Sequence, residues 1–261
     1  MPGSWALTPP YFLVFGFVSG IAGFRLGWRT GHRFALPLVQ TMLGWIGFLV
    51  AWTIVGPAWA AMTVLAWAAG TSAASIYVFF RQPKETDARV IRAAPYRESM
   101  LAWLRTGEGP ERTPLVMLTQ HAREALWYTA AAVATANVAS IAMGAVLLNY
   151  MNAYVATLLR AATRSGVVLL LGWNVWSVIR VVAYVLIGAA AAYPILTLSH
   201  RGGDAGAAGR LAVLGASGIA VDVVLKLVLS RSYGRLLARA VDLTAAGKNA
   251  STDVPVALDL D

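Results

Sequence analysis

The sequence predicts an all-α fold, a polytopic transmembrane helical bundle with about six spans, and three observations support this. Hydrophobic side chains make up 58% of the 261 residues and charged ones 13%, against roughly 25% charged residues in a soluble domain. Apolar stretches of about 20 residues, the length that crosses a hydrocarbon core of about 30 Å, recur along the chain. Arginines gather where these stretches end, as they do at the cytoplasmic ends of membrane helices.

Three apolar stretches come first, at about residues 9–27, 34–55 and 58–80. Pro10 suits a first helical turn, where its missing N–H would have had no partner, and Gly56–Pro57 marks a turn. Arginines follow the first and third stretches, so these ends are expected in the cytoplasm. The N-terminus is therefore expected outside the cell membrane.

Glycines recur on one face of the first stretch, several of them at G-x-x-x-G spacing: Gly16, Gly20, Gly23 and Gly27. Small residues at this spacing let a second helix approach the backbone closely. The face is thus a candidate contact for a second copy of the chain or for a membrane partner subunit.

Residues 81–124 form a hydrophilic segment that divides the chain. They hold eight of the 21 Lys and Arg residues and six of the 12 acids, whereas residues 1–80 hold no acid. Four regions follow: a three-span unit at 1–80, a cytoplasmic loop at 81–124, a second transmembrane unit at 125–229, and a basic amphipathic helix with a disordered tail at 230–261.

Within the loop, Pro95–Arg105 carries apolar residues at helical spacing, among them Tyr96 and Trp103. The pattern predicts a short cytoplasmic amphipathic helix in the membrane interface. This helix either packs against the bundle or docks a partner, and Trp103 and Arg97 are the docking candidates.

The second half is less regular. A fourth span is predicted at about 125–148, a fifth at 176–198 and the last at 211–229. The intervening stretches are interpreted as an outer surface segment at 149–164, a short interfacial or re-entrant piece at 166–175 and a flexible glycine-rich connector at 202–209. A basic amphipathic helix at 230–243 then places Arg231, Arg235 and Arg239 on one face, and these three arginines are further interface or docking candidates. A disordered tail is expected after Thr244.

Charge placement and span count conflict in this half. Six spans from an outer N-terminus place the C-terminus outside together with Arg160 and Arg164, although arginines favour the cytoplasm. Either a seventh crossing lies between Asn149 and Ser199, or the second half departs from the charge rule. Six spans are the preferred interpretation and seven stay open.

Charged residues inside the predicted spans are the strongest candidates for a site. Asp222 and Lys226 lie one helical turn apart in the last span, and Arg180 lies in the fifth, within reach of Asp222. An ionised side chain at mid-membrane costs about 3 kcal/mol or more and needs a partner. The three residues form either a structural ion pair between helices or a site for a substrate or a coupling ion.

Three amides near Arg180 form a second group of candidates. Asn149, Asn152 and Asn174 lie close in sequence to several tryptophans and tyrosines. Amides between aromatic walls suit a small polar ligand, whereas an aromatic belt at the outer interface has the same composition. His121 and Glu124 add an imidazole and a carboxylate at the start of the predicted fourth span, where an acid also favours a helix N-terminus.

The residue types that are absent from the sequence limit the functions that the protein can have. With no cysteine, disulfides and thiolate metal sites are excluded, and no cofactor, metal ligand or catalytic residue is assigned. The net charge of +9 is interpreted as contact with anionic lipid headgroups and not with nucleic acid. The preferred function is a transporter or permease-like component for a small polar or ionic solute. A non-catalytic subunit or assembly factor is the alternative, and a membrane-embedded lipid-modifying enzyme the third.

Overall fold

The computed structural model describes residues 10–107, 114–199 and 204–251, and within these ranges the chain forms eleven α-helices and no strand. The helices are α1 (Pro10–Arg29), α2 (Ala35–Val55), α3 (Pro57–Arg81), α4 (Pro83–Arg89), α5 (Ala93–Thr106), α6 (Pro114–Ala134), α7 (Val138–Arg160), α8 (Ser165–Leu171), α9 (Val175–Leu198), α10 (Ala205–Arg239) and α11 (Leu243–Ser251). Among the described residues, six helical segments are long and apolar enough to cross a membrane: α1, α2, α3, α7, the α8–α9 run and α10. The predicted fold class is confirmed.

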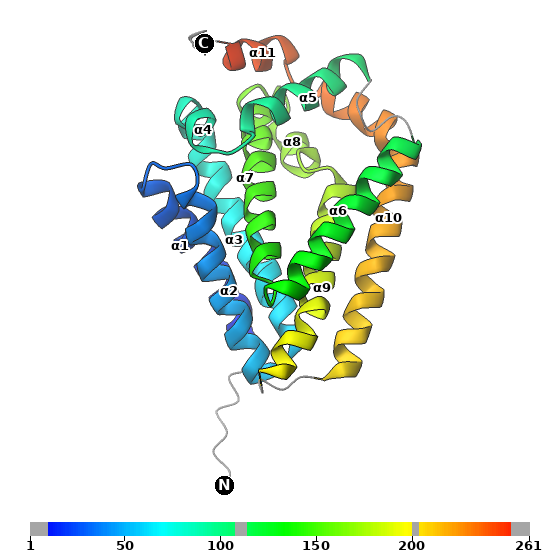
Figure 1. The fold of residues 1–261 in the computed structure, drawn as a ribbon. Coiled ribbons are helices and arrows are strands. Elements are labelled where there is room, and N and C mark those ends of the chain that lie inside the picture. Colours follow the sequence, from blue (N-terminus) through cyan, green and yellow to red (C-terminus); the bar gives the residue numbers. More distant parts are fainter. Residues whose placement is uncertain (1–9, 108–113, 200–203, 252–261) are drawn as a thin grey trace, which may run out of the picture.

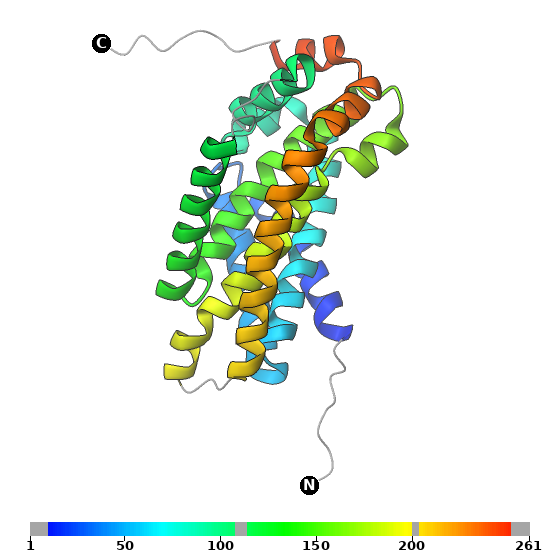
Figure 2. The ribbon, with the colours of Figure 1, turned by 90° about the vertical axis from the view of Figure 1, so that its right-hand side faces the viewer.

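The long helices run up and down through one bundle, and its two ends differ (Figures 1 and 2). Helices α4, α5, α8 and α11 cover one end, whereas the α2–α3 turn and the start of α10 lie at the other. Four long helices finish at the covered end, each with an arginine: Arg29, Arg81, Arg160 and Arg239. We call this the arginine end and the opposite one the Gly56 end.

The first three helices match the predicted stretches, and the glycine face of α1 holds them together. A Cβ added at Gly20 would lie 2.2 Å from the carbonyl oxygen of Trp67 on α3, and one at Gly16 would lie 2.4 Å from that of Thr63. Gly23 and Gly27 instead meet α2. The face that was expected to contact a second copy or a partner subunit is therefore occupied within the same chain.

The predicted fourth span at 125–148 is wrong, because a sharp turn divides it into α6 and α7. Ala136 and Asn137 adopt positive φ angles of 47° and 74°; asparagine tolerates this left-handed conformation because its side chain is short and polar. The Oγ1 atom of Thr135 accepts a hydrogen bond from the Ala139 N–H at 2.9 Å, and the Trp45 indole donates one to the Ala136 carbonyl at 3.0 Å. These bonds replace those lost where the helix is interrupted.

Helices α6 and α7 form a hairpin that enters from the arginine end and returns to it. In both views its turn stops short of the level that α9 and α10 reach at the Gly56 end (Figures 1 and 2). The segment 149–164, expected along the outer surface, is instead largely the second half of α7. The segment can enter the bundle although it carries an arginine, because Arg160 lies at the last position of α7 and donates a hydrogen bond to the Phe79 carbonyl at 2.6 Å.

This hairpin brings Arg160 and the end of α10 to the same end of the bundle. It adds one more passage between Pro114 and Arg160, so the end of α10 lies at the arginine end with Arg160. The additional passage is not hidden after Asn149, where the sequence had left it open. It comes from the division of the predicted fourth span.

Helices α8 and α9 agree with their predicted positions, but α10 does not. α10 is one helix of 35 residues that includes part of the predicted flexible connector and of the separate basic helix. Asp204 caps it by accepting the Gly206 N–H at 2.8 Å, and Gly215 and Gly218 pack against α9 at Ala183. The tail expected after Thr244 forms α11 up to Ser251, and its remainder, 252–261, lies outside the described residues, as does His200.

Helix α5 packs against the other helices of the bundle. Its Trp103 ring meets that of Trp176 edge-on with centroids 6.5 Å apart. Arg97 is buried and its Nη2 atom donates to Oδ2 of Asp87 at 2.9 Å. Arg97 therefore cannot serve as an exposed docking residue, and Trp103 is partly buried in the bundle.

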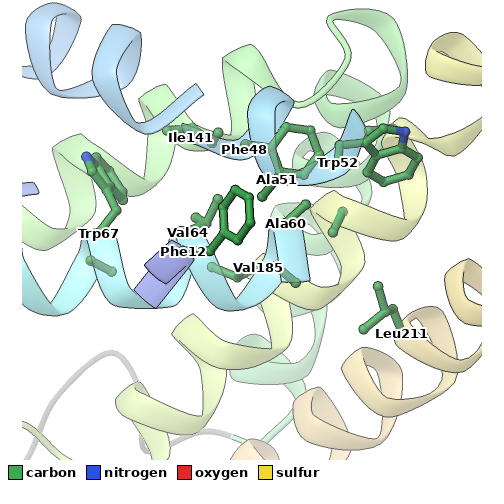
Figure 3. Packing of buried hydrophobic residues seen from close by; sticks show 14 of the residues in the cluster. Phe12, Phe48, Ala51, Trp52, Ala60, Val64, Trp67, Ile141, Val185 and Leu211 are labelled. Carbon is green, nitrogen blue, oxygen red and sulfur yellow. The ribbon is translucent and has the colours of Figure 1, made fainter. Parts of the chain in front are cut away.

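Toward the Gly56 end, the middle of the bundle is filled by apolar side chains (Figure 3). Phe48 and Trp52 from α2, Val64 and Trp67 from α3, and Val185 from α9 belong to one buried cluster. The cluster forms the apolar core of that half of the bundle.

Candidate functional site

A cavity of about 420 Å³ lies near the arginine end, between α5, α6, α7 and α9. Helix α5 contributes Tyr96 and Trp103, α7 contributes Tyr150, and α9 contributes Trp176 and Tyr184. The cavity therefore has aromatic walls. The apolar face of α5 forms part of these walls.

The charged residues of the cavity are mostly basic. Arg92 precedes α5, Arg123 and Glu124 come from α6, and Arg180 comes from α9. Glu124 is the one acid among the described residues that line the cavity. Asn174, at the start of α9, also lines it and is 5% exposed; its Oδ1 atom has no hydrogen-bond partner among the described residues.

Arg180 connects this cavity to a buried carboxylate. Its Nε and Nη2 atoms donate to the two carboxylate oxygens of Asp222 at 2.8 and 3.0 Å. Asp222 is fully buried, whereas the Arg180 side chain keeps 19% of its surface exposed. A bidentate contact of this kind fixes the guanidinium plane. Asp222 therefore orients Arg180, which lines the cavity.

A second polar chain begins one turn further along α10. The Lys226 Nζ atom lies 3.4 Å from Nε2 of His121 on α6, and both side chains are buried. The Nδ1 atom of His121 lies 3.8 Å from Oε2 of Glu124. Lys226, His121 and Glu124 thus form a line from the buried face of α10 to the cavity.

Helix α6 brings His121 and Glu124 into this line because α9 holds it firmly. The Tyr128 ring stacks on the Tyr184 ring with centroids 4.7 Å apart. Ser140 of α7 donates to the Tyr128 carbonyl at 3.3 Å. Sequence reasoning missed this arrangement, because His121 and Glu124 were placed at the mouth of a continuous span.

Asn149 and Asn152 are buried structural residues and do not line the cavity. Asn149 exchanges two hydrogen bonds with Gln40 of α2, at 2.7 and 3.2 Å. Asn152 donates to Ser75 at 2.7 Å and accepts from the Trp173 indole at 3.1 Å. Their amides hold α7 to its neighbours, which removes them from the candidate ligand-binding residues.

The structure therefore brings together only part of the predicted site. Arg180, Asp222 and Asn174 lie at or next to the cavity, and Lys226 lies on the adjoining chain of contacts. Arg231, Arg235 and Arg239 are exposed at the arginine end and lie apart from it. Arg92 and Arg123 were not predicted, because nothing local in the sequence distinguishes them from other basic residues of the loop.

The six apolar helices make this protein an integral, multi-pass membrane protein. No family model, curated protein or solved structure matches the chain. Among the described residues, no group of three His, Cys, Asp or Glu side chains is placed to hold a metal ion. The chemistry of the cavity has to be inferred from its own lining residues.

Proposed function

We propose that the protein is a transporter or permease-like component for a small organic anion, and the arginine-lined cavity is the observation that carries this proposal. Arg92, Arg123 and Arg180 line it together with Glu124. Even when Asp222 is counted as the partner of Arg180, three positive charges meet two negative ones. A cavity with an excess of positive charge favours an anion.

The size and walls of the cavity suggest which anions fit. A volume of about 420 Å³ falls in the usual range of small-molecule sites, roughly 300–1,000 Å³. The rings of Tyr96, Trp103 and Trp176 offer flat apolar surfaces, while the Asn174 Oδ1 atom offers an acceptor to a ligand hydroxyl or amide. An organic anion with an aromatic or apolar part matches this lining better than a bare inorganic ion does.

The buried cluster in Figure 3 sets what transport would require. Most of its residues come from the halves of α2, α3, α7 and α9 nearer the Gly56 end, beyond the cavity lining. Passage to the other side would require α9 and α10 to move relative to α2 and α3. Alternating access of one site to the two sides of the membrane is the usual arrangement in secondary transporters.

We also propose that the arginine end faces the cytoplasm in the cell membrane. Arg29, Arg81, Arg160 and Arg239 all end helices there, and the positive-inside bias favours this orientation. Exposed Arg231 and Arg235 are placed to meet anionic headgroups of that leaflet, or a partner subunit if the protein is a non-catalytic component.

The proposal is tested by counterflow, the uptake of radiolabelled anion into proteoliposomes that are preloaded with the same unlabelled anion. The probes are benzenesulfonate, succinate and inorganic phosphate. Wild-type protein should respond to at least one probe, with benzenesulfonate giving the strongest response. Arg123→Gln should lower the apparent affinity for the anion about tenfold, which is equivalent to about 1.4 kcal/mol for one charge-assisted hydrogen bond.

Arg235→Gln is the matched control, because this exposed arginine lies outside the cavity. Absence of any response in the wild type, or an equal loss in both variants, would overturn the proposal.

A further inference from the structure

We infer that His121 is a proton-binding group that couples proton movement to the anion in the cavity, so that the two cross together. This inference rests on the proposed function and adds its coupling ion. Its basis is the line of contacts from Lys226 through His121 to Glu124, which begins in the buried interior and ends at the cavity wall.

The resting state in this inference follows from assigning Lys226 the charged form. An ammonium group can only donate, which makes Nε2 of His121 at 3.4 Å the acceptor. The ring proton is then on Nδ1, which faces the Glu124 carboxylate at 3.8 Å. With these assignments His121 is neutral and its Nε2 lone pair is directed at Lys226.

Charge counting shows why a second proton requires an anion. The charged groups that face His121 are Lys226 and Asp222 from α10, Arg180 from α9, and Glu124 on its own helix. Two are positive and two negative, so the set is balanced while His121 is neutral. Protonation adds a buried positive charge that needs compensation. An anion beside Arg180 and Glu124 in the cavity would supply it.

Protonation also disrupts a specific contact. When Lys226 withdraws, the Nε2 lone pair takes a proton from a hydronium ion; one O–H bond breaks, one N–H bond forms, and water leaves. Two donors, the Nε2–H and the ammonium group, cannot then share the 3.4 Å contact that joins α6 to α10. Loss of this contact removes one link between α6 and α10 when a proton and an anion are bound.

Proteoliposomes with an alkaline interior and radiolabelled benzenesulfonate test the coupling, since this probe stays charged at all working pH values. With one proton per anion, a gradient of one pH unit should drive about tenfold accumulation. Proton entry, followed by a trapped pH dye, should accompany it. In His121→Gln the accumulation ratio should fall to about one under the same gradient, while exchange of labelled for unlabelled anion, which needs no net proton movement, continues.

Two further variants keep the test decisive. His32→Gln, at an exposed histidine in the α1–α2 turn, should accumulate like the wild type. Glu124→Gln changes the half-exposed end of the chain of contacts, and it should also lose accumulation. It therefore provides the test if the His121→Gln protein fails to fold. Exchange without proton entry in the wild type, or undiminished accumulation in a folded His121→Gln or Glu124→Gln protein, would overturn the coupling and leave the proposed function intact. Absence of exchange with any of the three anions in the wild type would overturn both.

Discussion

Asp222, Lys226 and Arg180 show how single residues keep charge inside this bundle. Asp222 is fully buried and receives two hydrogen bonds from Arg180. An uncompensated ion at this depth would be costly, whereas a bidentate pair offsets much of the desolvation of both partners. The same pair also positions Arg180 at the cavity, so stability and the proposed binding role depend on one contact.

Asp222→Asn is therefore expected to lower the free energy of unfolding by about 3 kcal/mol, because Arg180 would keep its charge without a carboxylate partner. Reversible unfolding in detergent micelles, followed by tryptophan fluorescence, measures this. The double variant Arg180→Gln with Asp222→Asn should recover part of the loss, since no unpaired charge remains.

The exposed pair of Asp204 and Arg210 provides the control for this prediction. Its atoms are 3.5 Å apart and both side chains are mostly exposed. Asp204→Asn should cost about 0.5 kcal/mol or less, because asparagine also caps helices well. Equal effects at Asp204 and Asp222 would contradict the structural role of the buried pair.

At the scale of the elements, close helix contacts depend on individual glycines. Gly20 on α1 lies against the backbone of α3, where a Cβ would be 2.2 Å from the Trp67 carbonyl oxygen and 2.8 Å from the Thr71 nitrogen. Backbone atoms cannot move aside as a flexible side chain can. Gly144 on α7 has open space, with no atom within 4 Å of the same added carbon.

Gly20→Ala should consequently destabilise the protein by about 1–3 kcal/mol through overpacking, whereas Gly144→Ala should be neutral or stabilise by up to about 1 kcal/mol through helix propensity. Thermal unfolding of the two purified variants compares them directly. A Gly20→Ala protein as stable as Gly144→Ala would show that α1 does not pack on α3 as described.

For the whole molecule, the hairpin of α6 and α7 decides where the chain ends. It returns the chain to the arginine end before α9 and α10 make their own pair of passages. Thr106 at the end of α5 and Arg239 at the end of α10 therefore share one end, and Ala58 at the start of α3 lies at the other.

Single cysteines test this arrangement cleanly, because the natural chain contains none. In intact cells, an impermeant maleimide should label Ala58→Cys, and it should label Thr106→Cys and Arg239→Cys only after the membrane is permeabilised. All three positions are exposed. Labelling of Thr106→Cys and Arg239→Cys from opposite sides would contradict the fold; labelling of both from outside would reverse only the proposed orientation.

The sequence by itself determined the fold class, the first three helices and the position of α9. Long apolar stretches, terminal arginines and the Gly56–Pro57 turn are local signals, and the bilayer requires helices of that length. It also indicated that Asp222, Lys226 and Arg180 need partners. The cost of burying a charge is a property of the residue and needs no knowledge of its neighbours.

Only the tertiary structure decided how these elements and residues meet. The turn at Ala136 and Asn137 has no glycine or proline to mark it, and it is held by the distant Trp45. The cavity combines Arg92, Arg123 and Arg180 from three segments, and His121 meets Lys226 across 105 positions in the sequence. Such contacts depend on packing between helices, which neither composition nor periodicity of a single segment records.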